Sequence, residues 1–97
     1  MRQKNQSVYI IRCGKTDFYK VGIAKNIKKR KQQLQLANPF YLRLVYAKKY
    51  EDYKASDIEK KLHDKLCLYN IRGEWFELTS DQLYQVKTYL DGGIKML

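Results

Sequence analysis

An arginine lies among the apolar positions of a short amphipathic segment in the first half of the sequence. Arg30 follows Ile27 by three positions and precedes Leu34 by four, so the three side chains would share one face of a helix. Such an arginine can lay its aliphatic stem along the core while its charged end reaches water. Alternatively, a guanidinium held beside the core offers a fixed fork of N–H donors that could bind a phosphate group. The segment alone leaves both interpretations open.

A tyrosine, a lysine and a glycine would share one face of a predicted β-hairpin. Two short segments rich in β-branched and aromatic residues, 7–13 and 18–23, flank a loop of turn-forming residues. If they pair across this loop, Tyr9 lies opposite Gly22, and strand alternation places Lys20 on the same face. The glycine would leave space for a ligand beside the hydroxyl and the ammonium. The plainer interpretation is that Tyr9 packs at a sheet edge and Lys20 is solvated.

A carboxylate and the one histidine of the chain lie four positions apart in a second predicted helix. Glu59 could be a metal ligand, with His63 one turn later on the same face. However, the sequence "SDIE" also matches a capping box, in which Ser56 caps the helix and Glu59 bonds back to the Ser56 amide. A helix that began nearer Tyr53 would remove the capping role and free the carboxylate.

The elements that must position these side chains alternate between strands and helices. The pattern predicts strands at 7–13, 18–23 and 41–49, helices at 26–36, 56–68 and 79–90, and a short strand or turn around Gly73. This order, β-β-α-β-α-(β)-α, is typical of an α+β fold with a small three-stranded antiparallel sheet flanked by helices. A chain of 97 residues has apolar surface for one modest core, so we expect a single domain over residues 1–97.

The charge of the chain favours a polyanionic partner. Twenty Lys and Arg against ten Asp and Glu give a net charge of +10, and each phosphate neutralised by a cation releases condensed counterions. Nucleic acid is favoured over a membrane because no apolar run approaches the ~20 residues that span a bilayer. The first residues also lack the apolar core of a signal peptide. We therefore expect a soluble intracellular protein with no membrane partner.

Two cysteines and one histidine exclude an ordinary structural zinc site, which needs four such ligands. Cys13 and Cys67 lie far apart in the sequence and have no C-x-x-C spacing. We expect both to be reduced and mostly buried thiols.

Five short motifs occur along the chain in a characteristic order: VYI at 8–10, YKVG at 19–22, IAKNIKKR at 23–30, IEKKLH at 58–63 and RGEWF at 72–76. In this order and spacing the chain resembles the GIY-YIG nuclease superfamily, and most closely its short branch from phages and large DNA viruses. The resemblance covers about residues 7–78 and leaves 79–90 for a C-terminal helix. Superfamily members are metal-dependent endonucleases with a three-stranded antiparallel sheet, which implies the fold class already predicted. It also implies the cytoplasm of a bacterial or virus-infected cell as the location.

The resemblance implies a role for each of the residues singled out above. Tyr9 would help to generate the attacking hydroxide, Arg30 would stabilise charge on the phosphate, and Glu59 would bind one Mg²⁺ or Mn²⁺ ion. A tyrosine with an ordinary pKa of about 10 is a poor base at neutral pH, so cations around Tyr9 would be needed to stabilise its phenolate. The nearby basic residues expected to contact nucleic acid are Lys25, Lys28, Lys29 and Lys31.

The chain also departs from the superfamily pattern. The second tyrosine of the family name falls at Lys20, and Tyr19, one position early, should point to the opposite face, so the base is either Tyr9 or Lys20. The position one turn after Arg30, often a polar helper in the superfamily, is Leu34 here, and by this interpretation His63 takes over the helper role. The late asparagine of the family has only loose matches, Asn70 or Glu74.

Three functions are consistent with the sequence. The leading one is a metal-dependent endonuclease that hydrolyses DNA phosphodiester bonds. The alternatives are a catalytically inactive, basic nucleic-acid-binding domain of the same fold and a protein-interaction module for an acidic partner. Because the predicted domain leaves no residues for a separate specificity module, we expect weak sequence preference, or recruitment by a homodimer or a partner protein. The apolar segment 94–97 could serve such a dimer or pack on its own core.

Overall fold

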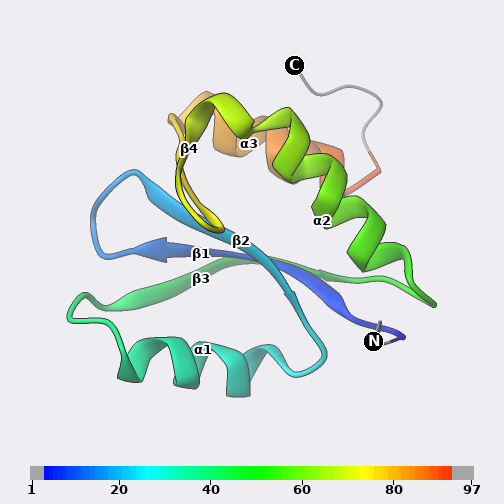
Figure 1. Ribbon diagram of the computed structural model, residues 1–97, viewed down its shortest axis with the longest axis horizontal. Coiled ribbons are helices and arrows are strands. Elements are labelled where there is room, and N and C mark those ends of the chain that lie inside the picture. Colours follow the sequence, from blue (N-terminus) through cyan, green and yellow to red (C-terminus); the bar gives the residue numbers. More distant parts are fainter. Residues whose placement is uncertain (1–3, 93–97) are drawn as a thin grey trace.

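The computed structural model describes residues 4–92, so the apolar segment 94–97 lies outside the described residues. One face of an antiparallel sheet is covered by α1 and the other by α2 and α3 (Figure 1). The elements are β1 Ser7–Cys13, β2 Phe18–Ala24, α1 Ile27–Leu36, β3 Leu42–Lys49, α2 Lys54–Lys65, a 3₁₀ turn Cys67–Tyr69, β4 Asn70–Arg72, β5 Trp75–Glu77 and α3 Ser80–Leu90. Within the described chain, no helix is long and apolar enough to cross a membrane.

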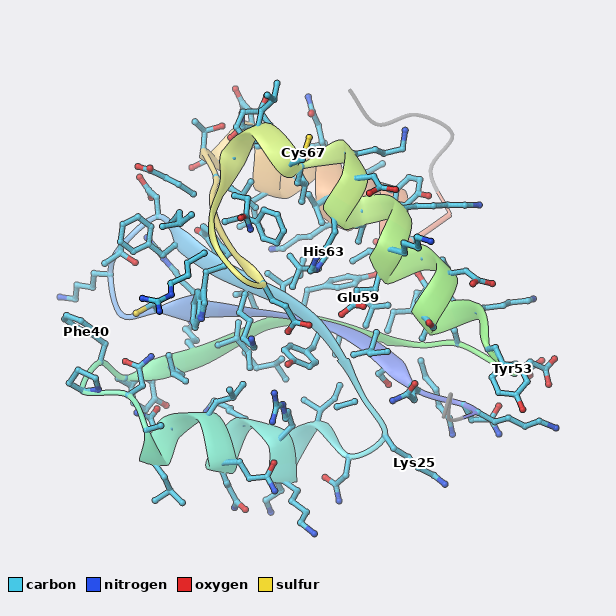
Figure 2. All side chains as sticks on the ribbon, in the orientation of Figure 1. Lys25, Phe40, Tyr53, Glu59, His63 and Cys67 are labelled. Carbon is cyan, nitrogen blue, oxygen red and sulfur yellow. The ribbon has the colours of Figure 1, made fainter. Side chains whose placement is uncertain are left out.

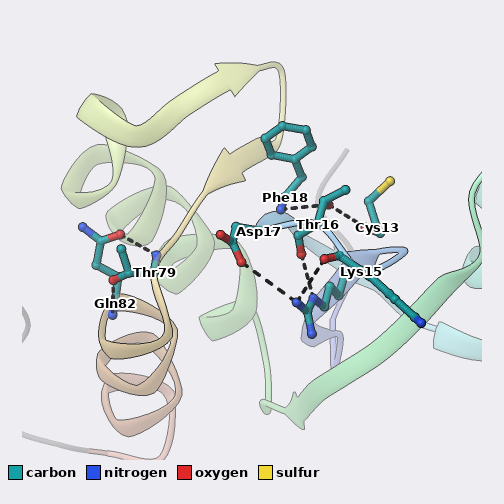
Figure 3. Close-up of polar contacts among 8 residues, drawn as sticks. Cys13, Lys15, Thr16, Asp17, Phe18, Thr79 and Gln82 are labelled. Carbon is teal, nitrogen blue, oxygen red and sulfur yellow. Dashed lines mark hydrogen bonds and ion pairs between the residues drawn. The ribbon is translucent and has the colours of Figure 1, made fainter.

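The hairpin of β1 and β2 has the predicted register. Tyr9 pairs with Gly22 and Ile11 pairs with Lys20, which confirms that Tyr9, Lys20 and Gly22 share a face. Side-chain hydrogen bonds within the connecting loop hold this register (Figure 3): the Thr16 hydroxyl donates to the Cys13 carbonyl at 2.6 Å and accepts from the Phe18 amide at 3.1 Å. The position of the Tyr9 side chain therefore follows from local turn chemistry.

The prediction of a three-stranded sheet is wrong, because the sheet has five strands in the order β3-β1-β2-β5-β4. The two additional strands form a tight hairpin around Gly73, whose φ of +56° lies in the left-handed region that glycine adopts without strain. β5 pairs with β2 only over Phe18–Lys20. Each new strand has three residues, which is too short to give an alternating pattern in the sequence.

The two faces of the sheet bury separate sets of apolar side chains. The core under α2 and α3 includes Val8, Ile10, Tyr19, Val21, Leu62, Phe76 and Val86. The smaller core under α1 contains Tyr9, Ile11, Cys13, Ala24 and Leu42, with Ile27, Leu34 and Trp75 packed against it. Strand alternation in β1 thus sends Tyr9 toward α1 and its two neighbours toward α2.

Helix α2 begins earlier than predicted, and the capping box proposed for Ser56 and Glu59 is wrong. The chain enters the helix through a turn at Asp52, with φ +52°, and the N-cap residue is Tyr53. Ser56 therefore lies inside the first turn, where it cannot cap. The helix ends at Lys65 rather than at residue 68 because the chain tightens into the 3₁₀ turn.

Both cysteines are free thiols, as expected, but they differ in exposure. Cys13 is buried in the core under α1. Cys67 is exposed at the start of the 3₁₀ turn, so the expectation that it is buried is wrong.

Candidate active site

Half of β2 has an open edge, and side chains from both faces of the sheet meet there. β2 pairs with β5 over Phe18–Lys20. One more backbone hydrogen bond follows, in which the Val21 amide donates to the Glu74 carbonyl at 3.1 Å. From there to Ala24, no strand of the described chain pairs with this edge. The His63 ring of α2 fills part of the vacant position, with its Nε2 atom 2.9 Å from the Val21 carbonyl oxygen.

Gly22 is the point at which the two faces come into contact. A Cβ atom at this position would lie 2.5 Å from the Tyr9 hydroxyl oxygen and 3.1 Å from Glu74 Oε1. The first distance is far shorter than van der Waals contact, and the second is slightly shorter than it. The space expected for a ligand is therefore taken by the Tyr9 phenol and the Glu74 carboxylate. The absence of a side chain at Gly22 is what lets these two polar groups meet.

The Tyr9 phenol is buried, with 1% of its surface exposed, and Arg30 is its cationic partner. The pKa of Tyr9 is raised above its ordinary value of 10, mainly by burial and also by the carboxylates of Glu74 and Glu59, while the hydrogen bond and charge of Arg30 oppose this shift. Arg30 reaches this position because Asn26 fixes the start of α1 by accepting a hydrogen bond from a first-turn amide at 3.0 Å. Arg30 is half-buried, and its hydrogen bond with the buried Tyr9 side chain shows that its guanidinium points inward.

Lys20 is buried and ion-paired, which excludes the plainer interpretation that it is solvated. Only 8% of its surface is exposed, and its ammonium lies 3.0 Å from Glu74 Oε1 and 5.7 Å from the centroid of the Trp75 ring. Glu74, which the motif comparison offered only as a loose match, is therefore central to the site. We call the side chains around this glycine the Gly22 cluster: Tyr9, Lys20, Arg30, Glu59 and Glu74.

Glu59 brings a carboxylate from α2 into this cluster (Figure 2). Its Oε2 atom is buried and has no hydrogen-bond partner among the described residues. Burial raises the pKa of Glu59, and the charge of Glu74 and a hydrogen bond with its carboxyl group raise it further, whereas His63 and Lys20 lower it. A buried carboxylate oxygen without a partner is costly, and a hard divalent cation is one ligand that would satisfy it.

A comparison with known families adds a finding that is independent of this geometry. The family model of the T5orf172 domain matches residues 6–90, which is most of the chain. The chain belongs to the T5orf172 domain family. This domain is found in nuclease-like proteins of phages and bacteria. The match contains the entire Gly22 cluster, from Tyr9 to Glu74. No curated protein and no solved structure matches the chain.

In this T5orf172 domain, His63 is fixed in place by the sheet. A carbonyl oxygen can only accept, so the Nε2 atom beside Val21 must carry a proton and donate it. The ring also stands edge-on to Phe76, with centroids 5.0 Å apart and planes at 78°. Of the two ring nitrogens, only Nδ1 is left for chemistry at the neighbouring cluster.

The remaining predicted site residues of the T5orf172 domain lie away from the cluster or have other partners. Tyr19 is 4% exposed and lies in the core under α2, on the face opposite Lys20, as predicted. The Asn70 side chain donates to the carbonyls of Gly73 and Trp75, at 2.8 and 3.1 Å, and so closes the β4–β5 turn. This leaves Glu74, not Asn70, as the polar group that the hairpin brings to the cluster.

The lysines near α1 form a basic surface beside Arg30. Lys25, Lys28 and Lys29 are exposed, and Lys25 lies where β2 gives way to α1 (Figure 2). Lys31 is half-buried, with its ammonium 5.3 Å from the centroid of the Tyr41 ring. None of the described residues forms a group of three or more His, Cys, Asp or Glu placed to hold a metal ion.

Proposed function

We propose that this T5orf172 domain is a metal-dependent endonuclease of the GIY-YIG type that hydrolyses phosphodiester bonds in DNA. The observation that carries the proposal is the unpartnered, buried oxygen of Glu59 in the same cluster as the Tyr9 and Arg30 pair. A domain that only binds phosphate has no use for such a carboxylate, because it repels the ligand. A phosphodiester hydrolase needs such a carboxylate, because it can hold a cation at the reacting phosphate.

The cluster offers a proton acceptor and a phosphate-binding group in contact with each other. Arg30 would bind a non-bridging phosphate oxygen through its planar fork and offset the negative charge that develops there. Burial raises the pKa of Tyr9 above its ordinary value of 10, so Tyr9 would accept the proton of the attacking water only where Arg30 and a bound divalent cation together stabilise its phenolate. Lys20 is a poorer candidate for the base, because an ammonium ion-paired with Glu74 has no lone pair to accept a proton.

A divalent ion, Mg²⁺ or Mn²⁺, fits the donors that are present. Glu59 would hold it through the oxygen that has no other partner, and Glu74 could serve as a second carboxylate. Magnesium is commonly bound by one or two carboxylates, with water and substrate phosphate as its other ligands. When bound, such an ion would act as a Lewis acid toward the phosphate.

The decisive test is nicking of supercoiled plasmid in Mg²⁺, Mn²⁺ or EDTA. We expect the wild-type protein to nick only with a metal ion, and the Glu59→Ala protein to lose this activity. Asp64→Ala is the matched control, because it removes an exposed carboxylate from the same helix and should keep full activity. Plasmid binding without nicking in any metal would overturn the nuclease proposal in favour of a basic binding domain.

The exposed lysines on α1 are expected to contact the DNA backbone. Lys28→Ala and Lys29→Ala should each weaken binding to all sequences alike and reduce the slope of log affinity against log salt by about 0.9. Fluorescence anisotropy in EDTA at several salt concentrations measures this slope. Lys61→Ala, which removes an exposed lysine from α2, should leave it unchanged. An equal effect at Lys61 would show that the DNA lies on a different face.

A further inference from the structure

An aromatic groove opens on the α1 side of the sheet, between the ends of β1 and β2 next to their loop, the α1–β3 loop and the β4–β5 hairpin. It encloses about 360 Å³ and is lined by the rings of Phe18, Phe40 and Trp75 together with Cys13, Ile71 and Arg72. Phe18 and Phe40 are 39% and 56% exposed, and Phe40 projects from the loop between α1 and β3 (Figure 2). We call it the Trp75 groove. Large apolar side chains exposed together on a basic surface require an explanation.

The groove is continuous with the Gly22 cluster through two neighbouring residues. Trp75 lines the groove with its ring and lies 5.7 Å from the ammonium of Lys20, which belongs to the cluster. The same face of β2 carries every second residue, namely Phe18, Lys20 and Gly22. At about 3.3 Å per strand residue, Phe18 lies about 13 Å from Gly22. A short stretch of one nucleic-acid strand could therefore occupy the groove and the cluster together.

The chemistry of the groove suits a nucleobase. Aromatic rings bind any base by stacking, and a nearby guanidinium, here Arg72, adds attraction for the base and its phosphate. A base still paired within a duplex has its faces covered by its neighbours and cannot enter. We propose that the Trp75 groove binds an unstacked nucleobase of a DNA strand whose phosphate lies at the Gly22 cluster. This proposal rests on the proposed function and makes single-stranded or locally unpaired DNA the substrate of the site.

Trp75 itself reports on the groove, because it is the one tryptophan of the chain. The full-length protein is titrated in EDTA with a thymine oligonucleotide, an abasic oligonucleotide of the same length and a blunt duplex. We expect Trp75 fluorescence to be quenched strongly by the thymine strand and weakly by the abasic strand and the duplex. Equal quenching by the thymine and abasic strands would overturn the proposal, because the phosphates alone would then account for it.

Phe40→Ala separates base binding from phosphate binding. We expect it to weaken binding of the thymine strand about tenfold and to leave the affinity for the abasic strand unchanged. Tyr84→Ala, which removes an aromatic ring that is 71% exposed on α3, should change neither affinity. If Phe40→Ala lowers the affinity for the two strands equally, or for neither of them, the groove does not bind a base.

The outcome of this titration is independent of catalysis, because EDTA prevents cleavage. Plasmid nicking without a base-dependent signal from Trp75 would overturn only the proposal that the Trp75 groove binds a base. A base-dependent signal without nicking in any metal would overturn the nuclease proposal and leave the groove as a binding site.

Discussion

Replacing Glu59 by glutamine is expected to abolish metal-dependent nicking and also to stabilise the metal-free protein at neutral pH. Nicking should fall at least about 100-fold, as when one preorganised charge is removed from an active site. The free energy of unfolding should rise by about 1 kcal/mol, which raises Tm by about 4–8 °C in a domain of this size. The two changes have opposite signs because a group that serves a ligand is costly when the ligand is absent.

The pH dependence of this effect follows from the raised pKa of Glu59. Burial favours the protonated carboxyl, so between its ordinary value of 4.5 and the raised value the folded state binds more protons than the unfolded state. The stability of the wild-type protein therefore falls as pH increases through this window. The advantage of Glu59→Gln over wild type should be small below pH 4.5 and largest above the raised pKa. Urea denaturation in EDTA at a series of pH values measures it.

A bound metal ion should make the wild-type protein more stable than the Glu59→Gln protein. Binding to the folded state raises the Tm of the wild-type protein in proportion to the logarithm of the Mg²⁺ or Mn²⁺ concentration, and Glu59→Gln should show little response. Asp64→Asn, an exposed change on the same helix, should match wild type in every respect. A glutamine variant that is less stable than wild type at pH 7 would mean that the Glu59 carboxylate supports the fold rather than a ligand.

Local sequence signals were sufficient for one side of the site. The register of the first hairpin follows from its short loop, and the spacing to Leu34 places Arg30 on the inward face of α1, although it left open whether the guanidinium would reach water. Each of these depends on residues close together in the sequence. The pairing of Tyr9 with Gly22 could therefore be predicted without knowledge of the rest of the chain.

The other side of the site depends on contacts between distant segments, which the sequence pattern does not encode. Glu59 was ambiguous because a serine three residues earlier imitates a cap, and the true start of α2 is set by the turn at Asp52. Glu74 was missed as a central residue because β5 is stable only through its pairing with β2. Without that pairing, nothing in the sequence brings Glu74 next to Lys20.

The polar groups of the cluster constrain one another, since each lies where it would be unfavourable alone. Lys20 is buried but paired with Glu74, and the Tyr9 hydroxyl is buried but bonded to Arg30. Glu59 alone retains an unpartnered oxygen. Such a network tolerates little displacement, because moving one member leaves another buried and unpaired. The most sensitive position should therefore be the one where two of these groups touch the backbone.

That position is Gly22, and Gly22→Ala is expected to abolish the proposed nicking activity although it adds only a methyl group. The new Cβ would lie 2.5 Å from the Tyr9 hydroxyl and 2.7 Å from its ring carbon, so the phenol must move away. Overpacking of this kind costs about 1–3 kcal/mol of stability. A displacement of about 1 Å at a reacting group costs about 100-fold in rate. Thermal unfolding and plasmid nicking of the purified variant measure the two effects.

Two further variants separate the displacement of Tyr9 from a general loss of stability. Ile23→Val, the neighbouring residue on the opposite face of β2, should lose about 1 kcal/mol of stability but keep its nicking rate. Tyr9→Leu removes the two atoms closest to the new Cβ, so adding Gly22→Ala to it should cost much less stability than adding the same change to wild type. If the two costs are equal in this double-mutant cycle, Gly22 and Tyr9 are not in the contact that defines the site.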